Sequence, residues 1–302
     1  MENKVENPLF SIIIPHKNSA ALLARLIESI PHDFPCEILV VDDNSSASTI
    51  EELRGLRFPS SVRLIMIGEP GGNAGRARNL GLRHARSPWI VFADADDVFT
   101  EAMPSALLSA ASDTAADIVY FDVTSRNEVG ETSYRHCTYS NLVRNAVDAN
   151  GVEELRYRHT PPWAKMFSRA FLKRIDARFD EVPASNDIYF SIFCAHNAAL
   201  VRTCSDIVYV VSQRSGSITN TISTTNLLSK FESALKVNSF LKSEGKSKFQ
   251  HSIIYFLYRT FTRNPYLGMV LLYRSVRAGN NPLIGARKLL SPIRTLQQRE
   301  SR

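Results

Sequence analysis

Three acidic side chains, Asp94, Asp96 and Asp97, lie within four residues directly after the apolar run 89–93 (WIVFA). Carboxylates this close repel one another unless a cation lies among them. Hard divalent ions such as Mn²⁺ and Mg²⁺ take oxygen ligands and bridge carboxylates to phosphates. The cluster therefore predicts a Mn²⁺ or Mg²⁺ site with these three residues as ligands. The alternative is an acidic turn that caps a helix starting near Glu101.

A second acidic pair, Asp42 and Asp43, follows the apolar run 37–41 and is itself followed by Asn44 and Ser45. Acidic residues at the end of a strand accept hydrogen bonds from nucleotide hydroxyl or N–H groups in other folds. An Asx turn with a helix cap is the alternative for the pair alone. Together with the first cluster, the pair predicts a nucleotide site.

The glycine-containing loop 68–75 (GEPGGNAG) leads into a helical segment that carries Arg78. The loop lacks the G-x-x-x-x-G-K-[ST] pattern, and no G-x-G-x-x-G follows the first apolar run, so P-loop and dinucleotide sites are excluded. We expect a tight turn that brings Arg78 towards the nucleotide. An ordinary exposed arginine is the alternative.

Short apolar runs alternate with segments of helical periodicity over the first hundred residues. The runs are 10–14, 37–41, 62–67 and 89–93, and the helical segments are 20–30, 49–56 and 75–84. This alternation predicts right-handed βαβ units and an α/β fold with a mixed, mostly parallel sheet flanked by helices. Ligands of such sheets collect at the carboxyl ends of the strands, where both acidic clusters fall.

The pattern is less regular further along the chain. A strand is predicted over 118–123, and from there to about residue 161 the regularity fades and no element is assigned. A strand, two helices, the second beginning near Asp187, and a strand over 200–211 follow. From residue 224 the chain is predicted to be helical.

Four runs, FSIIIPHKN, ILVVDDNS, NAGRARNLGL and WIVFADADD, resemble glycosyltransferase family 2, whose members are inverting enzymes with the fold called GT-A. The resemblance is dense over residues 9–100. It resumes at WAKMFSRAFL, ASNDIYFSIF and QRSGSIT, which resemble capsular and exopolysaccharide members. It implies that Pro15 borders the base, that Asp43 beside Asp42 holds a uracil, and that the Asp94–Asp97 element binds metal and ribose.

The same resemblance implies a catalytic base at Asp187. Family members carry Glu-Asp before an aromatic-rich helix, whereas this chain has Asn186-Asp187. A base of this kind takes the proton of the acceptor hydroxyl as its oxygen attacks the anomeric carbon. With Asn186 in place of Glu, the proposed base is retained, but the resemblance does not specify which contacts support it. A residue that only offsets the helix dipole is the alternative.

Three further residues are candidates for substrate contacts. By the same resemblance, Arg214 and Ser217 lie over the diphosphate, where arginine makes forked phosphate contacts. Trp163 is a candidate for stacking on an acceptor sugar, with core packing as its alternative.

Charge is unevenly distributed. The 302 residues carry a net charge of +6, while residues 226–302 hold 14 Lys and Arg against 3 Glu, a net of +11, which leaves −5 for the rest. An acidic body is not typical of a nucleic-acid enzyme. Apolar positions from Ile253 to Leu271 alternate with four arginines, a pattern that fits an anionic membrane or a helical arm packed on the catalytic domain or a second subunit. The arginines are Arg259, Arg263, Arg274 and Arg277.

The scattered cysteines and the absence of a signal-like N-terminal run predict a cytoplasmic protein. The basic C-terminal stretch adds a peripheral location at the inner face of the cell membrane as one option. The expected organisation is a catalytic domain over 1–223, with a nucleotide part at 9–110 and an acceptor part at 111–223, and a helical extension over 224–302. The expected reaction transfers a hexosyl or N-acetylhexosaminyl group from a UDP-sugar to a glycan or lipid-linked acceptor of a bacterial surface polysaccharide. A non-catalytic sugar-binding scaffold and a nucleotidyltransferase are the alternatives.

Overall fold

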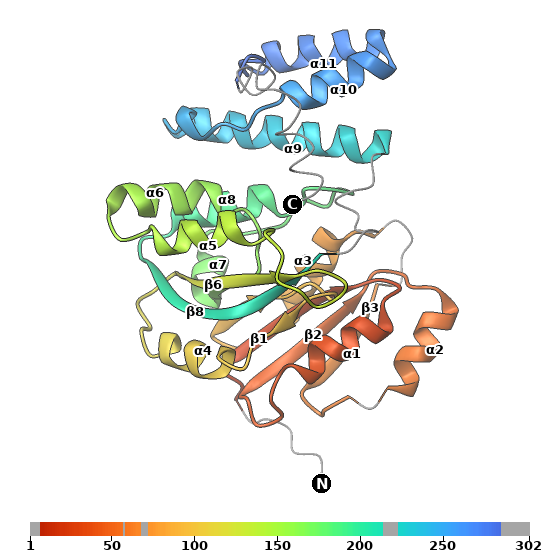
Figure 1. Cartoon of the computed structure of the whole chain (residues 1–302), viewed down its shortest axis with the longest axis vertical. Coiled ribbons are helices and arrows are strands. Elements are labelled where there is room, and N and C mark those ends of the chain that lie inside the picture. The colour runs from red at the N-terminus through yellow and green to blue at the C-terminus, as the bar shows by residue number, and fades with distance from the viewer. Residues whose placement is uncertain (1–6, 57, 68–71, 214–222, 285–302) are drawn as a thin grey trace. The chain divides into compact units, whose positions relative to one another are not determined.

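The computed structural model describes residues 7–56, 58–67, 72–213 and 223–284 (Figure 1). These residues form two compact units. The first contains the described residues up to Glu181 and from Phe190 to 213. The second contains Val182–Tyr189 and residues 223–284. The short segment Val182–Tyr189 thus groups with the C-terminal helices, although it precedes the last strand of the first unit in the chain.

The first unit is built on an eight-stranded sheet in the order β3-β2-β1-β4-β7-β6-β8-β5. The strands are β1 (Phe10–His16), β2 (Cys36–Asp42), β3 (Val62–Met66), β4 (Trp89–Phe92), β5 (Val98–Phe99), β6 (Ile118–Arg126), β7 (Lys165–Ser168) and β8 (Val201–Ser212). The strands β3, β2, β1 and β4 run parallel, as do β6 and β8. The pairs β4–β7, β6–β7 and β5–β8 are antiparallel. The predicted mixed, mostly parallel sheet is confirmed.

Helices cover both faces of this sheet, which explains the buried apolar runs in its strands β1, β2 and β4. The helices are α1 (Ala20–Glu28), α2 (Ala47–Gly55), α3 (Ala74–His84), α4 (Met103–Ala111), α5 (Cys137–Arg144), α6 (Ala149–Arg158), α7 (Arg169–Arg174) and, from Phe190 onward, α8 (Ile188–Asn197). Ile12 of β1 packs with Leu23 of α1 on one face. Its neighbour Ile13 packs with Phe190 of α8 on the other face.

A glycine sets the closeness of α3 to the sheet. A Cβ atom at Gly81 would lie 2.4 Å from Cγ2 of Ile13, so only a residue without a side chain allows this approach. The helix begins at the cap Asn73, whose Oδ1 accepts the Arg76 N–H at 3.0 Å. The predicted helix over 75–84 is therefore confirmed, and its start lies at the sheet edge where the acidic residues end their strands.

Two helices lie in the stretch 124–161, where the sequence analysis assigned no element. Helix α5 buries only Ser140 and Val143, and α6 buries only Leu155 and Tyr157. The two helices are only eight and ten residues long, shorter than the roughly 11–18 residues over which a helical period is read from sequence. The two-residue strand β5 was likewise not predicted, because a pair of residues carries no pattern.

The second unit is helical, as predicted. It contains α9 (Thr224–Ser243), a 3₁₀ turn (Ser247–Phe249), α10 (Ile254–Arg263) and α11 (Pro265–Arg277). Phe231 of α9, Leu257 of α10 and Leu271 of α11 meet in a small core of their own. Within the described ranges, no helix is long and apolar enough to cross a membrane.

Candidate functional site

The carboxyl ends of three parallel strands bring the acidic residues of the first unit to one sheet edge. His16 at the end of β1 pairs in register with Asp42 at the end of β2. Ile13 of β1 pairs with Phe92 of β4, so Asp94 follows two residues beyond that pair. The two acidic clusters predicted to share an edge therefore do so.

Asp42 is fully buried, and both of its carboxylate oxygens make hydrogen bonds within the protein. His16 Nδ1 lies 2.8 Å from Oδ2, while the Ser19 N–H donates to the other ring nitrogen at 3.2 Å. The backbone N–H of Ser45 donates to Oδ1 at 2.9 Å, and its hydroxyl donates to Oδ2 at 2.6 Å. Asp42 consequently fixes the turn after β2. Its contacts match the Asx-turn alternative more closely than direct ligand binding.

Asp43 has a different environment. It is only 5% exposed, and its Oδ2 lies 3.6 Å from Lys17 Nζ. Its buried Oδ1 has no hydrogen-bond partner in the part of the chain that the structure describes. Burial raises the pKa of this carboxyl group, against the opposing effect of Lys17. Since a buried acceptor without a partner costs free energy, this oxygen is available for a donor from a ligand.

Asp94 and Asp96 are half-buried, whereas Asp97 is 3% exposed. Asp97 Oδ1 accepts the backbone N–H of Ser212 in β8 at 2.7 Å. Burial, followed by the charges of Asp96 and Asp94, raises the pKa of Asp97 well above its ordinary value. Among the described residues, no three His, Cys, Asp or Glu side chains are grouped to hold a metal. Asp94 and Asp96 are thus partly accessible, whereas a hydrogen bond from Ser212 holds Asp97 against β8.

Arg78 lies beside this cluster, as predicted. Its side chain is 6% exposed, and Nη2 donates to Asp94 Oδ1 at 2.7 Å. The guanidinium carbon lies 5.4 Å from the ring centre of Phe179. The next residue, Asn79, holds that ring in place, since its side chain accepts the Phe179 N–H at 2.8 Å and donates to the Phe179 carbonyl at 3.0 Å. The sequence analysis assigned no role to Asn79 or Phe179.

Tyr209 of β8 supports the same turn and was not predicted either. Its hydroxyl accepts the backbone N–H of Asp94 at 2.8 Å and also bonds the Asp97 carboxylate. Trp163 stacks on the Tyr209 ring, with ring centres 5.7 Å apart. Trp163 is only 6% exposed and belongs to the core. Its position therefore favours the core-packing alternative over contact with an acceptor sugar.

The remaining predicted site residues lie outside the two acidic clusters, although Pro15 is at the same edge of the sheet. Pro15 is partly buried near the end of β1, opposite Val41. Asp187 is half-buried in the second unit, immediately before α8. Arg214 and Ser217 lie outside the described residues.

Comparison with known proteins identifies the family. Residues 11–176, more than half of the 302 residues, match the family model described as glycosyl transferase family 2. The chain belongs to glycosyl transferase family 2. The matched region of this glycosyltransferase contains both acidic clusters, Arg78 and Trp163.

Two similar proteins are bacterial glycosyltransferases. GlyG of Streptococcus pneumoniae serotype 4 is 26% identical over 225 residues, covering 70% of this chain and 73% of GlyG. The poly(ribitol-phosphate) beta-N-acetylglucosaminyltransferase TarS of Staphylococcus aureus is 24% identical over 219 residues. That match covers 66% of this chain but only 35% of TarS, so the family 2 chain spans about a third of that relative.

Solved structures share the fold. A crystal structure of TarS residues 1–349 in complex with UDP-GlcNAc matches with a TM-score of 0.64 and 20% identity, covering 84% of this chain and 72% of that one. A mannosyltransferase from Pyrobaculum calidifontis, in complex with GDP-Man and Mn²⁺, matches with a TM-score of 0.57 and 19% identity, covering 97% and 84%. The predicted GT-A fold is confirmed.

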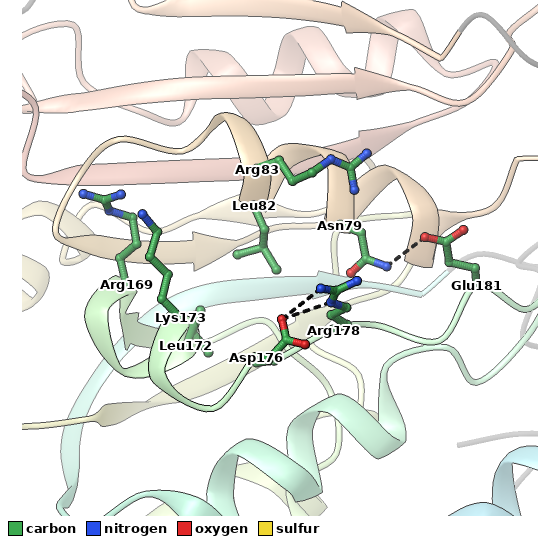
Figure 2. A pocket seen from close by; sticks show the side chains of 10 residues that line it. Asn79, Leu82, Arg83, Arg169, Leu172, Lys173, Asp176, Arg178 and Glu181 are labelled. Atoms are coloured by element: carbon green, nitrogen blue, oxygen red, sulfur yellow. Dashed lines mark hydrogen bonds and ion pairs between the residues drawn. The ribbon is translucent and has the colours of Figure 1, made fainter.

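This glycosyltransferase also has a shallow cavity of about 270 Å³ between α3 and the residues around α7 (Figure 2). Arg83, Arg169 and Lys173 line it, and Asp176 pairs with Arg178 at its rim at 3.0 Å. Of the predicted site residues that the structure describes, none lines this cavity. The candidate site is the acidic sheet edge.

Proposed function

We propose that this family 2 glycosyltransferase binds a UDP-sugar at the acidic sheet edge and transfers its hexosyl or N-acetylhexosaminyl group to a hydroxyl. The acceptor is proposed to be a glycan or lipid-linked intermediate of a bacterial surface polysaccharide. The similarity to TarS, a poly(ribitol-phosphate) beta-N-acetylglucosaminyltransferase, supports this assignment, as does the UDP-GlcNAc bound to residues 1–349 of TarS.

The observation that carries the donor assignment is the buried Oδ1 of Asp43, which has no hydrogen-bond partner among the described residues. The uracil ring offers one N–H, and a buried carboxylate oxygen is a strong acceptor for it. Pro15, near the end of the adjacent strand, would border the base. Asp42 contributes by fixing the turn through His16 and Ser45 rather than by touching the nucleotide.

For the metal, the donor set suits Mn²⁺ or Mg²⁺ because Asp94 and Asp96 offer half-accessible carboxylates. We therefore assign these two residues as ligands and Asp97 as the residue that ties their turn to β8. When bound, the ion neutralises the developing charge of the departing diphosphate. Arg78 holds Asp94 in place through its 2.7 Å contact. Arg214 and Ser217 remain proposed diphosphate contacts on the basis of the sequence resemblance.

The proposed base is Asp187. Its carboxylate accepts the proton of the acceptor hydroxyl, while the hydroxyl oxygen forms a bond to the anomeric carbon. The bond from that carbon to the diphosphate oxygen breaks, and the electron pair leaves with the UDP. A single displacement inverts the anomeric centre.

The test measures UDP release from a panel of UDP-GlcNAc, UDP-GalNAc, UDP-glucose and UDP-galactose with added Mn²⁺. We expect release from at least one donor, its loss in excess EDTA, and weaker UDP binding in Asp96→Asn. Asp187→Asn should cut turnover by about 10²-fold or more with unchanged UDP affinity. Asp176→Asn is the matched control, because it removes an exposed carboxylate outside the site. A chain that turns over none of the donors would support the scaffold alternative.

We also propose that the second unit binds an anionic membrane. The apolar positions expected to face lipid, such as Leu257 and Leu271, are instead buried in the core of this unit. Three tyrosines of α10 and α11 remain exposed, with Tyr258 at 56%, Tyr266 at 80% and Tyr273 at 64%. Tyrosine suits a membrane interface because its ring is apolar and its hydroxyl is polar, and the net positive charge of this unit attracts anionic lipid.

The structure sharpens the choice of variants. Arg274 pairs with Glu232 at 2.6 Å, so reversing its charge would disturb the unit itself. Arg263 and Arg277 are exposed, and their double change to Glu should release the protein from vesicles containing phosphatidylglycerol. Arg54→Glu in the first unit is the control. A parent protein that never sediments with these vesicles, and is dimeric instead, would identify α10 and α11 as a subunit arm.

A further inference from the structure

We propose that helix α9 positions the catalytic segment of this enzyme. The segment in question, Val182–Tyr189, carries Asp187, and the inference rests on the proposed role of that residue as the base. Segment and helix belong to the same compact unit. Several side chains of α9 contact the segment, and the spacing of four, three and four residues between those named below places them on one face of the helix. They include Ser229, Ser233, Lys236 and Phe240.

The contacts before Asp187 are hydrogen bonds to the backbone. The Ser229 hydroxyl donates to the Ala184 carbonyl at 2.8 Å and accepts the Ala184 N–H at 3.1 Å. The Ser233 hydroxyl donates to the Ser185 carbonyl at 2.7 Å. One face of α9 therefore makes hydrogen bonds to the N–H and carbonyl of Ala184 and to the carbonyl of Ser185.

Ser185 has a backbone conformation that needs such support. Its φ is +58°, in the left-handed region that residues with a side chain rarely adopt. A conformation of this kind persists only when its surroundings determine it. The hydrogen bond from Ser233, which is itself 5% exposed, supplies one such restraint two residues before Asp187.

The contacts after Asp187 are made by the aromatic ring of Tyr189. Lys236 Nζ lies 3.8 Å from the ring centre of Tyr189, within the range of a cation–π interaction. The ring of Phe240 meets Tyr189 edge-on at 5.6 Å. Helix α9 thus holds the chain on both sides of the proposed base, at Ala184 and Ser185 before it and at Tyr189 after it.

Within the segment, Asn186 adds a local link. It is 7% exposed, and its Nδ2 lies 3.4 Å from the Val182 carbonyl. Asn186 occupies the position where the family resemblance leads one to expect Glu. The direction of the Asp187 carboxylate therefore depends on this local turn together with the α9 face. We infer that Ser229 and Ser233 are positioning residues for the transfer step.

The test compares Ser229→Ala/Ser233→Ala with the parent, using the donor that supports UDP release. We expect kcat to fall at least tenfold while UDP affinity stays within twofold, because the nucleotide contacts belong to the first unit. In an Asp187→Asn background the serine changes should have no further effect on kcat, since they act through that carboxylate. Ser243→Ala is the control, as the hydroxyl contacts within the described residues are to Phe240 of the same helix and to the adjacent Glu244.

If the double variant does not fold, Ser233→Ala and Ser233→Thr are compared, and only the alanine should lower kcat, because threonine retains the hydroxyl. Two results would overturn the inference: a parent-like kcat in the serine variant, or a loss of kcat that adds in full to that of Asp187→Asn. Failure of the base assignment gives a different result, because Asp187→Asn itself would then retain parent turnover.

Discussion

Gly72 lies so close to the buried carboxylate of Asp43 that a methyl group cannot be added without displacing one of them. An ideal Cβ at this position would lie 1.4 Å from Oδ1, 2.6 Å from Cγ and 3.3 Å from Oδ2. Non-bonded carbon and oxygen atoms stay more than about 3 Å apart, so the two groups must separate by roughly 2 Å. The change Gly72→Ala therefore moves the oxygen that we assign to the uracil N–H.

The expected loss is that of one hydrogen bond to a charged group, about 1.5–3 kcal/mol. In dissociation constants this corresponds to UDP binding weakened by about 10- to 150-fold. Stability should change little, because the atoms in the way are the end of a side chain that can rotate. In addition, Oδ1 makes no hydrogen bond to the described residues that could be lost.

Isothermal titration of UDP in Mn²⁺ measures the effect, and circular dichroism monitors the fold. Gly55→Ala is the matched control, because no described atom lies within 4 Å of a Cβ at that position. In an Asp43→Ala background the change at Gly72 should have no further effect, since the atoms it displaces are gone. A folded Gly72→Ala protein that binds UDP as tightly as the parent would refute the assignment of Asp43 as the acceptor of the uracil N–H.

Three further outcomes are expected. Tyr209→Phe removes the acceptor of the Asp94 N–H, so it should weaken Mn²⁺-dependent UDP binding in titration while Mn²⁺-free binding is unchanged. Gly81→Ala should lower stability by about 1–3 kcal/mol, because its methyl group would overlap Ile13, and thermal unfolding would detect a fall of several degrees. Burial alone would raise the pKa of Glu37, but its hydrogen bonds outweigh burial and hold the pKa below its ordinary value. Its stabilisation is therefore present above that value and lost as the pH falls, so Glu37→Gln should destabilise at neutral pH and much less in acid, as urea titrations would show.

Much of the fold over the first hundred residues was predictable because the information for it is local. A parallel strand covered by helices on both faces must be apolar throughout, so β1, β2 and β4 stand out as short continuous runs. The rule that parallel strands end at a common edge then placed both acidic clusters together. Helices α5 and α6 were missed because each is short, at eight and ten residues, and mostly polar in sequence.

The part that each acidic residue plays was decided only by the tertiary structure. Asp42 and Asp43 are adjacent and chemically alike, yet Asp42 is bound by His16 from a neighbouring strand, and Asp43 keeps a buried oxygen without a partner among the described residues. Asp97 is bound to Ser212, more than a hundred residues later in the chain. Which carboxylate faces the ligand depends on such distant partners, and no local pattern records them.

The environment of Asp187 also depends on residues that are distant in the chain. Its sequence shows a carboxylate before a helix, which is a local feature. Its grouping with α9, through Ser229 and Ser233, joins residues more than forty positions apart. Residue type and spacing therefore determined which groups are present and at which edge of the sheet the two acidic clusters lie. The packing of distant elements determined which of them are held in place and which remain available for chemistry.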